Sequence, residues 1–533
     1  MRPAAHAEVL MPMLPTQISL TAFQEDLCFA YIFSNFVWRG YGASWLHQSA
    51  QGLLGQLAFD SVKALAEISF GRSQKSHRTE IQGRLKYGRA LRHMIERLGD
   101  GQKDGLWELV IPILLLLMHT TTLTNRSAAM FHLQAMTQIL SACGPQMFQH
   151  QPFRDAFEAA RATMVVASLV TRKRVFLDNP AWHTGPYALA PRSKAPQSYL
   201  LDILASVPGL LEDHHEFEQM LLQNHHLAFS APDRADAGCF EDIATSRSHM
   251  TNRVVAKLES LFVWRLHWQV AFGSDVWVEK TPSVESLARR NAPAAAANRH
   301  DKLRFSRPGA AADIALYNAV LMWLLALINE LEPLRAQFLV QSCAYQALMS
   351  MPDVAFAFTP GAAAATGLAE LPSCEPLRCV GSTTRVRDAA MEICRVFEWQ
   401  SANHASTTPS ETNFVYMFPI GLALCVLDAE PDTRGWIRAM LDANALTRDY
   451  GVGYGVDDGG LRYASRMGRL SLGGDAEVGT MEDLGAETGI LQRLQGFGWF
   501  VTRELADDGQ CREAPNPNLV HLLLLRGRTD ISA

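Results

Sequence analysis

The chain has 533 residues, of which 48% are hydrophobic and 19% charged, and its net charge is −6. This length can bury a large interior, either as about two to four domains or as one continuous helical body. The negative charge excludes a chain that binds nucleic acid over its whole surface, because phosphate binding needs a concentrated excess of Lys and Arg.

The nine cysteines and the apolar runs indicate the compartment. Irregular cysteine spacing favours reduced thiols inside the cell over a disulfide framework. Prolines interrupt the N-terminal sequence MRPAAHAEVLMPMLPTQ before an apolar core develops, so we expect no signal peptide. The apolar runs that begin at Leu109 and Ala319 are about half as long as the roughly 20 residues of a membrane-spanning helix. We therefore predict buried core helices and no membrane association.

Helical periodicity marks the first part of the chain. Apolar side chains recur at steps of three and four in LLGQLAFDSVKALAEI (53–68) and YGRALRHMIERL (87–98), which predicts two one-faced helices. Further helices are predicted over 106–119, 128–142 and 153–170. Gly144 followed by Pro145 is a typical helix ending. Helices in such a series are expected to pack antiparallel.

The stretch RKRVFLDNPAW, Arg172 to Trp182, is predicted to end the helix over 153–170. Asn179 precedes Pro180 and is biased out of the helical region, so we expect the helix to continue through Arg174 and stop near Asp178. The three cations would then lie in its last turn, where they suit the helix dipole. The segment that follows the helix is expected to pack on the core through Phe176, Leu177 and Trp182.

The second half shows almost no alternation of the β type. Helices are predicted over 199–213, 254–270, 413–428 and 435–446, and long apolar helices are predicted from Ile314 to about Leu348. The predicted fold class is all-α, a large multi-helix bundle or array of antiparallel helices with long loops near 286–313 and 353–378. We divide the chain into an N-terminal segment (1–43), two helical parts (44–230 and 231–450) and a loop-rich region with one helix (451–533).

The run LEDHHEFEQMLLQNHH is the most metal-like in the chain, with His214, His215, His225 and His226. A zinc-binding helix places its two imidazoles four residues apart, and Gln219 occupies the position four residues after His215. We interpret the His and Glu residues as the polar side of an amphipathic helix. Its apolar side is formed by Phe217, Met220, Leu221 and Leu227.

Other candidate chemistry is equally weak. Cys374 and Cys379 have no second pair at ligand spacing, and the chain contains no C-x-x-C. The sequence DYGVGYGVDDGG fits neither a dinucleotide fingerprint nor a P-loop, and no G-x-S-x-G elbow occurs. We predict no catalytic, cofactor-binding or metal-binding residue, and no enzymatic activity.

Two basic stretches bear on partners. Residues 72–97 hold eight Lys or Arg against two Glu, so they could contact DNA phosphates or an acidic partner. A solvated helix face explains the same pattern, because the arginines alternate with the apolar stripe. The triplet at Arg172 to Arg174 is shorter than the five to eight basic residues of a nuclear-import patch.

The order of several motifs resembles the regulatory domain of fungal-specific transcription factors, the helical region that follows a Zn2Cys6 cluster in that family. AFDSVKALAEISFG, YGRALRHMIERL and LVIPILLLLMHTT resemble its first helices. FHLQAMTQILSACGP resembles a His-x-x-Gly helix, with Ala135 in place of the glycine. RKRVFLDNPAW resembles an element that includes Phe-Leu-x-x-Pro-x-Trp, and LLDILASVPGLLED follows it, as in the family. The likeness is clearest from about Leu46 to Asp213.

One departure from the family changes the expected function. Only Cys28 precedes residue 100, so the six-cysteine zinc cluster is missing from this sequence. The resemblance implies a nuclear transcriptional regulator without cofactors that reaches DNA indirectly, through a DNA-bound transcription factor or co-regulator, and that could form a homodimer. It is equally consistent with a regulator whose zinc module was lost or was omitted from the gene model. Control of a secondary-metabolite gene cluster is one such role. The alternative is a helical sensor that binds a small apolar metabolite among helices such as VLMWLLALI.

Overall fold

The computed structural model describes residues 23–35, 43–99, 105–122, 126–230, 237–279, 302–351, 376–403 and 417–427, together with positions 433, 435–437 and 440. Within these ranges helices dominate, and one small two-stranded sheet is present. The predicted all-α class is confirmed. The predicted loop over 353–375 and the predicted helix after residue 451 lie outside the described residues.

The longer helices are α1 (Gln24–Asn35), α2 (Ala43–Ala50), α3 (Gln56–Ser73), α4 (His77–Gly99), α5 (Val110–Thr122), α6 (Arg126–Cys143), α7 (Phe153–Thr171), α9 (Pro196–Ser230), α10 (Ala237–Phe272), α12 (Pro308–Leu331), α13 (Ala336–Ser350), α14 (Val386–Asn403) and α15 (Met417–Leu427). Short helices link α7 to α9: η4 (Phe176–Asp178), α8 (Pro180–Thr184), η5 (Gly185–Tyr187) and η6 (Pro191–Ser193). Another short helix, η2 (Leu106–Leu109), precedes α5.

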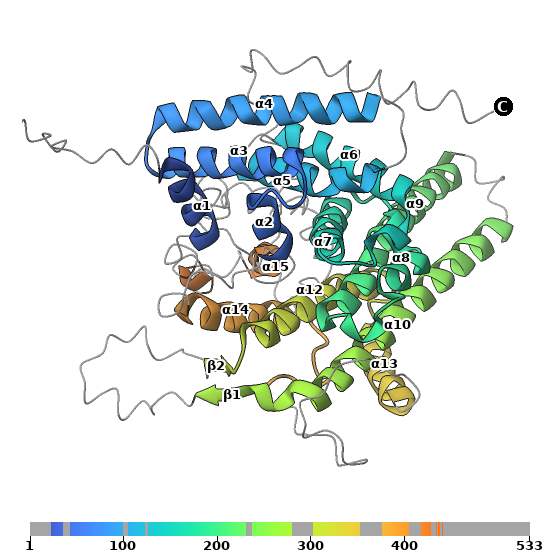
Figure 1. The fold of residues 1–533 in the computed structure, drawn as a ribbon. Helices are drawn as coiled ribbons and strands as arrows, with labels where there is room; N and C mark the ends of the chain where they lie inside the picture. The colour runs from blue at the N-terminus through green and yellow to red at the C-terminus, as the bar shows by residue number, and fades with distance from the viewer. Residues whose placement is uncertain are drawn as a thin grey trace, which may run out of the picture.

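The first helices form one end of the molecule, where α3 and α4 lie antiparallel and α4 is outermost (Figure 1). Two glycines allow this close approach. A Cβ on Gly71 would lie 2.6 Å from the backbone nitrogen of Glu80, and a Cβ on Gly83 would lie 2.6 Å from Ile68. Below this pair, α5 packs against α3 and α6, and its residues 110–118 are all buried. The helices predicted over 53–68, 87–98, 106–119 and 128–142 are therefore confirmed. Gly144 follows α6 with a φ of 75°, as predicted for its ending.

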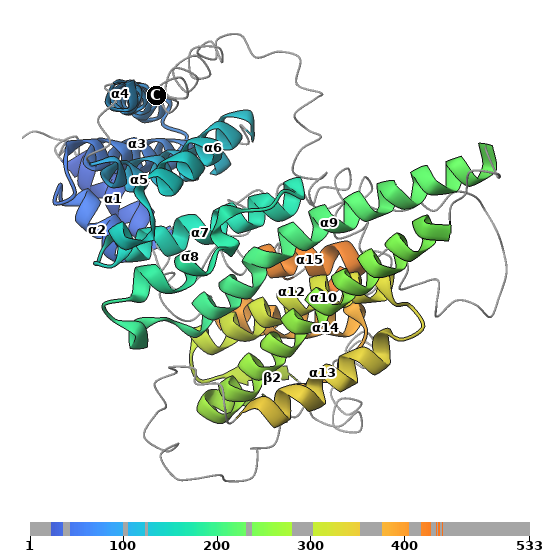
Figure 2. The same cartoon turned by 90° about the vertical axis from the view of Figure 1, so that its right-hand side faces the viewer.

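The other end of the molecule surrounds α12. This helix contacts α9, α10, α14 and α15, and Figure 2 shows it between them. Among the described residues, α12 is the one helix long and apolar enough to cross a membrane, and the whole of that apolar stretch is buried within the protein. The core helix of a globular protein has the same apolar composition as a membrane-spanning helix, and a buried core helix was predicted here. The predicted apolar helices between Ile314 and about Leu348 are confirmed as α12 and α13, which a turn at 332–335 separates.

A short sheet contradicts part of the predicted loop over 286–313. Strands β1 (Val276–Glu279) and β2 (Lys302–Phe305) pair antiparallel, with Val276 opposite Phe305. Phe305 then packs on Trp399 of α14, with ring centroids 5.1 Å apart. Each strand has only four residues, which is too short for a visible alternation. Helix α12 also begins at Pro308, inside the predicted loop.

The end of α7 differs from the prediction. The helix ends at Thr171 because Arg172 adopts a left-handed conformation with a φ of 52°. The cations Arg172 to Arg174 therefore follow the helix and do not form its last turn. Asn179 does have extended backbone, as its position before a proline predicts, and its side chain accepts a hydrogen bond from Ala181 N at the start of α8.

Candidate functional site

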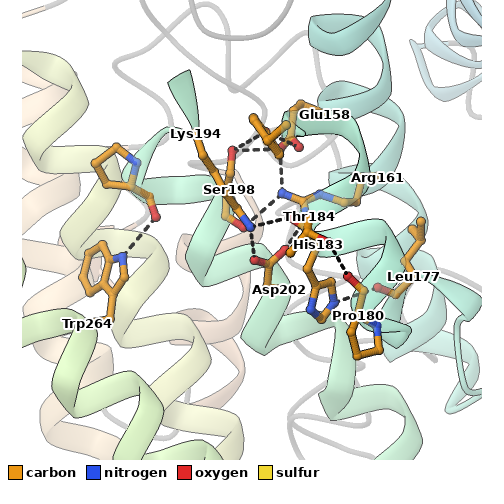
Figure 3. Close-up of polar contacts among 12 residues, drawn as sticks. Glu158, Arg161, Leu177, Pro180, His183, Thr184, Lys194, Ser198, Asp202 and Trp264 are labelled. Carbon is orange, nitrogen blue, oxygen red and sulfur yellow. Dashed lines mark hydrogen bonds and ion pairs between the residues drawn. The ribbon is translucent and has the colours of Figure 1, made fainter. Parts of the chain in front are cut away.

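A buried charge network joins α7 to α9 (Figure 3). Its members are Glu158, Arg161, Tyr187, Lys194, Ser198 and Asp202. Helix α7 supplies the first two, the first turns of α9 supply Ser198 and Asp202, and the linking segment supplies Tyr187 and Lys194. The network therefore holds two cations and two carboxylates in the interior.

Arg161 is the centre of the network and is fully buried. One guanidinium nitrogen donates to Asp202 Oδ1 at 2.5 Å, and the other donates to Glu158 Oε2 at 2.7 Å and to the Ser198 carbonyl at 3.0 Å. Charge-assisted hydrogen bonds of this kind are the stronger ones in proteins. Arg161 thus fixes α7 against the start of α9.

Glu158 completes the acidic side of the network. Its Oε1 accepts from Tyr187 OH at 2.6 Å, and its Oε2 accepts from Ser198 Oγ at 3.0 Å. The Ser198 hydroxyl also accepts from Tyr187 OH at 3.1 Å. Because Ser198 is fully buried and already bonded on both sides, a substrate cannot reach its oxygen.

Lys194 forms the basic side near the linking segment. Its ammonium group donates to the His183 carbonyl at 2.8 Å and to Asp202 Oδ2, and it lies 4.5 Å from the ring centre of Tyr199. Burial lowers the pKa of Lys194, and the Asp202 carboxylate opposes that shift. Burial likewise lowers the pKa of His183, whose Nε2 lies 2.9 Å from the Leu177 carbonyl. The hydrogen bonds of the network hold three segments together: α7, the linking segment and the start of α9.

The stretch from Arg172 to Trp182 acts as architecture, as predicted. Lys173 Nζ donates to Glu212 Oε1 at 3.0 Å, and Arg174 donates to Asp213 Oδ1 at 2.6 Å, so the cations bind α9. On the other side of the stretch, Leu177 and Trp182 are buried, and Phe176 packs against the core.

The histidine run is less polar than the sequence indicates. His214 is buried, which corrects its assignment to the polar face, whereas the expected apolar Leu221 is exposed. Burial lowers the pKa of His214, and the nearby Glu218 carboxylate opposes that shift.

The side chains of His225 and His226, and Cys374, lie outside the described residues. Cys379 is exposed. Over the part of the chain that the structure describes, no three metal-ligating side chains gather.

A second group of buried polar side chains lies among α10, α12 and α14, and sequence reasoning missed it. Trp268 Nε1 donates to Asp313 Oδ2 at 2.9 Å. Arg265 donates to Gln269 Oε1 at 2.5 Å and lies 5.1 Å from the Trp268 ring centre. Burial raises the pKa of Glu392, and the charge of Arg265 opposes that shift. The available signal was isolated charges inside otherwise apolar helices, such as Asp313 in PGAAADIALYNAVLM.

Asp313 makes stability depend on pH. Burial raises its pKa from 3.8 to about 6, although the Trp268 hydrogen bond and Arg307 act in the other direction. The folded state therefore holds the proton more tightly than the unfolded chain, so the free energy of unfolding falls as pH rises from about 4 to about 6. Asp313→Asn should gain about 2–3 kcal/mol relative to the native chain between pH 4 and pH 7. Urea unfolding at both pH values measures this gain.

Asp26→Asn, at an exposed position, is the control. Its stability should differ from that of the native chain by less than about 1 kcal/mol at pH 7. A pH-independent difference for Asp313→Asn would contradict the assignment of the raised pKa.

No family model, curated protein or solved structure matches the chain.

Proposed function

We propose that the protein is a helical transcriptional regulator that acts in the nucleus through a DNA-bound partner. The sequence likeness to the fungal regulatory domain supports this proposal. Its segments also contact one another in the fold: Tyr87 OH of the Tyr-x-x-Ala-Leu helix lies 2.8 Å from His132 Nε2 of the His-x-x-Gly helix. Burial raises the pKa of Tyr87 to about 12 and lowers that of His132 to about 4, so both are neutral at neutral pH.

The observation that carries the proposal is a mixed stripe on the outer face of α4. Arg78, Ile81, Leu85, Arg89 and Arg92 recur at steps of three and four and are all exposed. The three arginines form no ion pair with a described residue. The stripe therefore offers positive charge on both sides of an apolar centre.

This stripe suits a protein partner better than DNA. Phosphates would pair with the arginines but would leave the Ile81 and Leu85 side chains in contact with nothing apolar. An acidic amphipathic helix supplies carboxylates and an apolar face together, which matches the stripe along its length. A regulator that reaches DNA through a partner needs such a contact.

Chromatin association tests the proposal. Chromatin immunoprecipitation of the tagged full chain should recover specific promoters, and recovery should fall to background in a strain that lacks the DNA-bound partner. Arg89→Glu should lower recovery at least threefold, because it reverses the charge next to the apolar centre of the contact. The matched charge reversal Arg192→Glu, at an exposed position away from α4, should leave recovery unchanged.

Two outcomes would overturn the proposal. Promoter recovery that persists without any DNA-bound partner would show that the chain binds DNA itself. Absence of the chain from every promoter in cells that express it would exclude a role in transcription.

One observation favours the metabolite sensor as a second candidate function. Asn318 Oδ1 and Trp323 Nε1 are buried in α12 and form no hydrogen bond with a described protein group. Buried polar atoms without partners are costly, and a ligand that pairs with them would bind well. Thermal-shift screening with small apolar metabolites tests this function, because a specific ligand raises the melting temperature with concentration. A flat response to every compound would remove the candidate.

A further inference from the structure

The outer face of α13 is apolar. Leu334, in the turn before the helix, is 88% exposed, and Phe338 and Tyr345 are 65% and 62% exposed. Leu348 and Met349 are exposed on the same side, because these positions recur at helical spacing. The opposite side of α13 is buried and faces α10; it consists of Ala336, Val340, Cys343 and Ala347. We call the five exposed residues the α13 stripe.

The α13 stripe is too large for an ordinary bare surface. Its five side chains expose roughly 600 Å² of surface, at the upper limit of the largest apolar patch on a typical monomer. Two copies packed stripe to stripe would remove roughly 1,200 Å², which reaches the lower bound of specific protein interfaces.

The chemistry of α13 suits a second copy of itself. From Ala336 to Ser350 the helix carries no charged residue, and its other exposed positions include Gln337, Gln341 and Gln346. A two-fold interface places a surface against its own copy, so any charge near the axis would meet a like charge. A charge-free face avoids that repulsion.

The order of side chains along the stripe is also symmetric. Leu334 and Met349 lie at equal distances from the midpoint between Gln341 and Ser342, and so do Phe338 and Tyr345. In an antiparallel pair about that midpoint, Phe338 of one copy faces Tyr345 of the other, and Leu334 faces Met349. Four of the five stripe residues therefore meet one another, Leu348 lies opposite the exposed Arg335, and the polar Gln341 and Ser342 lie at the axis.

We propose that the protein forms a homodimer through the α13 stripe, with the two α13 helices antiparallel. The inference is independent of the proposed function, since it rests on α13 alone. Sedimentation velocity of the purified full chain at tens of micromolar should show a dimer. Tyr345→Glu should raise the dissociation constant at least tenfold, because its carboxylate faces Phe338 of the other copy. Leu189→Glu, at a position 62% exposed elsewhere, is the matched control and should stay dimeric.

The antiparallel register gives a sharper test. Phe338→Lys should also dissociate the dimer, but Phe338→Lys combined with Tyr345→Glu should restore it, since each lysine then faces a glutamate of the other copy. Circular dichroism confirms that each variant is folded, and the restored pair keeps the test valid if one single variant unfolds.

A monomeric native chain at these concentrations would overturn the inference, as would a dimer that Tyr345→Glu and Phe338→Lys leave intact. A dimer that the single variants break and the double variant fails to restore would overturn the antiparallel register. If the native chain is monomeric, the stripe contacts another part of this chain or a different protein.

Discussion

Arg161→Met should lower the free energy of unfolding by about 3–5 kcal/mol, because it leaves Glu158 and Asp202 as interior carboxylates without their shared cation. Methionine keeps most of the volume of the side chain, so the loss reports the charge and the hydrogen bonds more than a cavity. Urea unfolding followed by circular dichroism measures the effect.

Two further variants separate the charge effect from general disruption. Glu158→Gln combined with Arg161→Met should be less destabilised than Arg161→Met alone, because one uncompensated charge has been removed. Arg97→Met is the matched control: Arg97 pairs with Glu108 at 3.3 Å and both side chains are about half exposed, so its loss should be under about 1 kcal/mol. Equal losses of unfolding free energy for Arg97→Met and Arg161→Met would mean that the buried network stabilises the fold no more than an exposed ion pair.

Trp182→Ala should also cost about 3–5 kcal/mol, since it removes a buried indole from a cluster of aromatic rings. Its ring centre lies 5.6 Å from Phe157, 5.1 Å from Phe176 and 6.2 Å from Phe148. Phe148 precedes α7, Phe157 lies in α7 and Phe176 lies in the exit turn, so the cavity would loosen the packing of the turn on α7. Thermal and urea unfolding both measure the loss.

The exposed Trp277 of β1 provides the control for this variant. Trp277→Ala should change the stability by less than about 1 kcal/mol, since its side chain is half exposed. A Trp182→Ala protein with native stability that no longer associates with its partner would contradict the architectural role of Trp182.

The helices were predictable where one local pattern sufficed. In α3 and α4 the apolar spacing identifies both elements, and the buried Val62, Leu65 and Met94 lie on the predicted faces. The end of α7 was not predictable, because the left-handed Arg172 is stabilised by contacts of the next two cations with α9. Composition does not indicate this helix end, whereas the Asn-Pro pair, which begins seven residues after Arg172, is a recognisable signal.

The charge network illustrates the second limit. Arg161 lies in FEAARATMVVASLV, where the helical pattern alone permits either an exposed or a buried arginine. Its burial depends on Asp202, which comes 41 residues later. A single sequence gives no means of pairing these residues, so the network could not be predicted.

The position of the charge network in the sequence has a consequence for folding during synthesis. Every hydrogen bond within the network joins residues between Glu158 and Asp202, whereas α12 needs neighbours as distant as α9 and α15. The chain leaves the ribosome from its N-terminus, and contacts close in sequence form with the smaller loss of chain entropy. We therefore expect the hydrogen bonds of the network to form while α10 and later helices are still being synthesised. Helices α7 and α9 are then already packed together when the apolar α12 leaves the ribosome, and α12 can bury its side chains against α9.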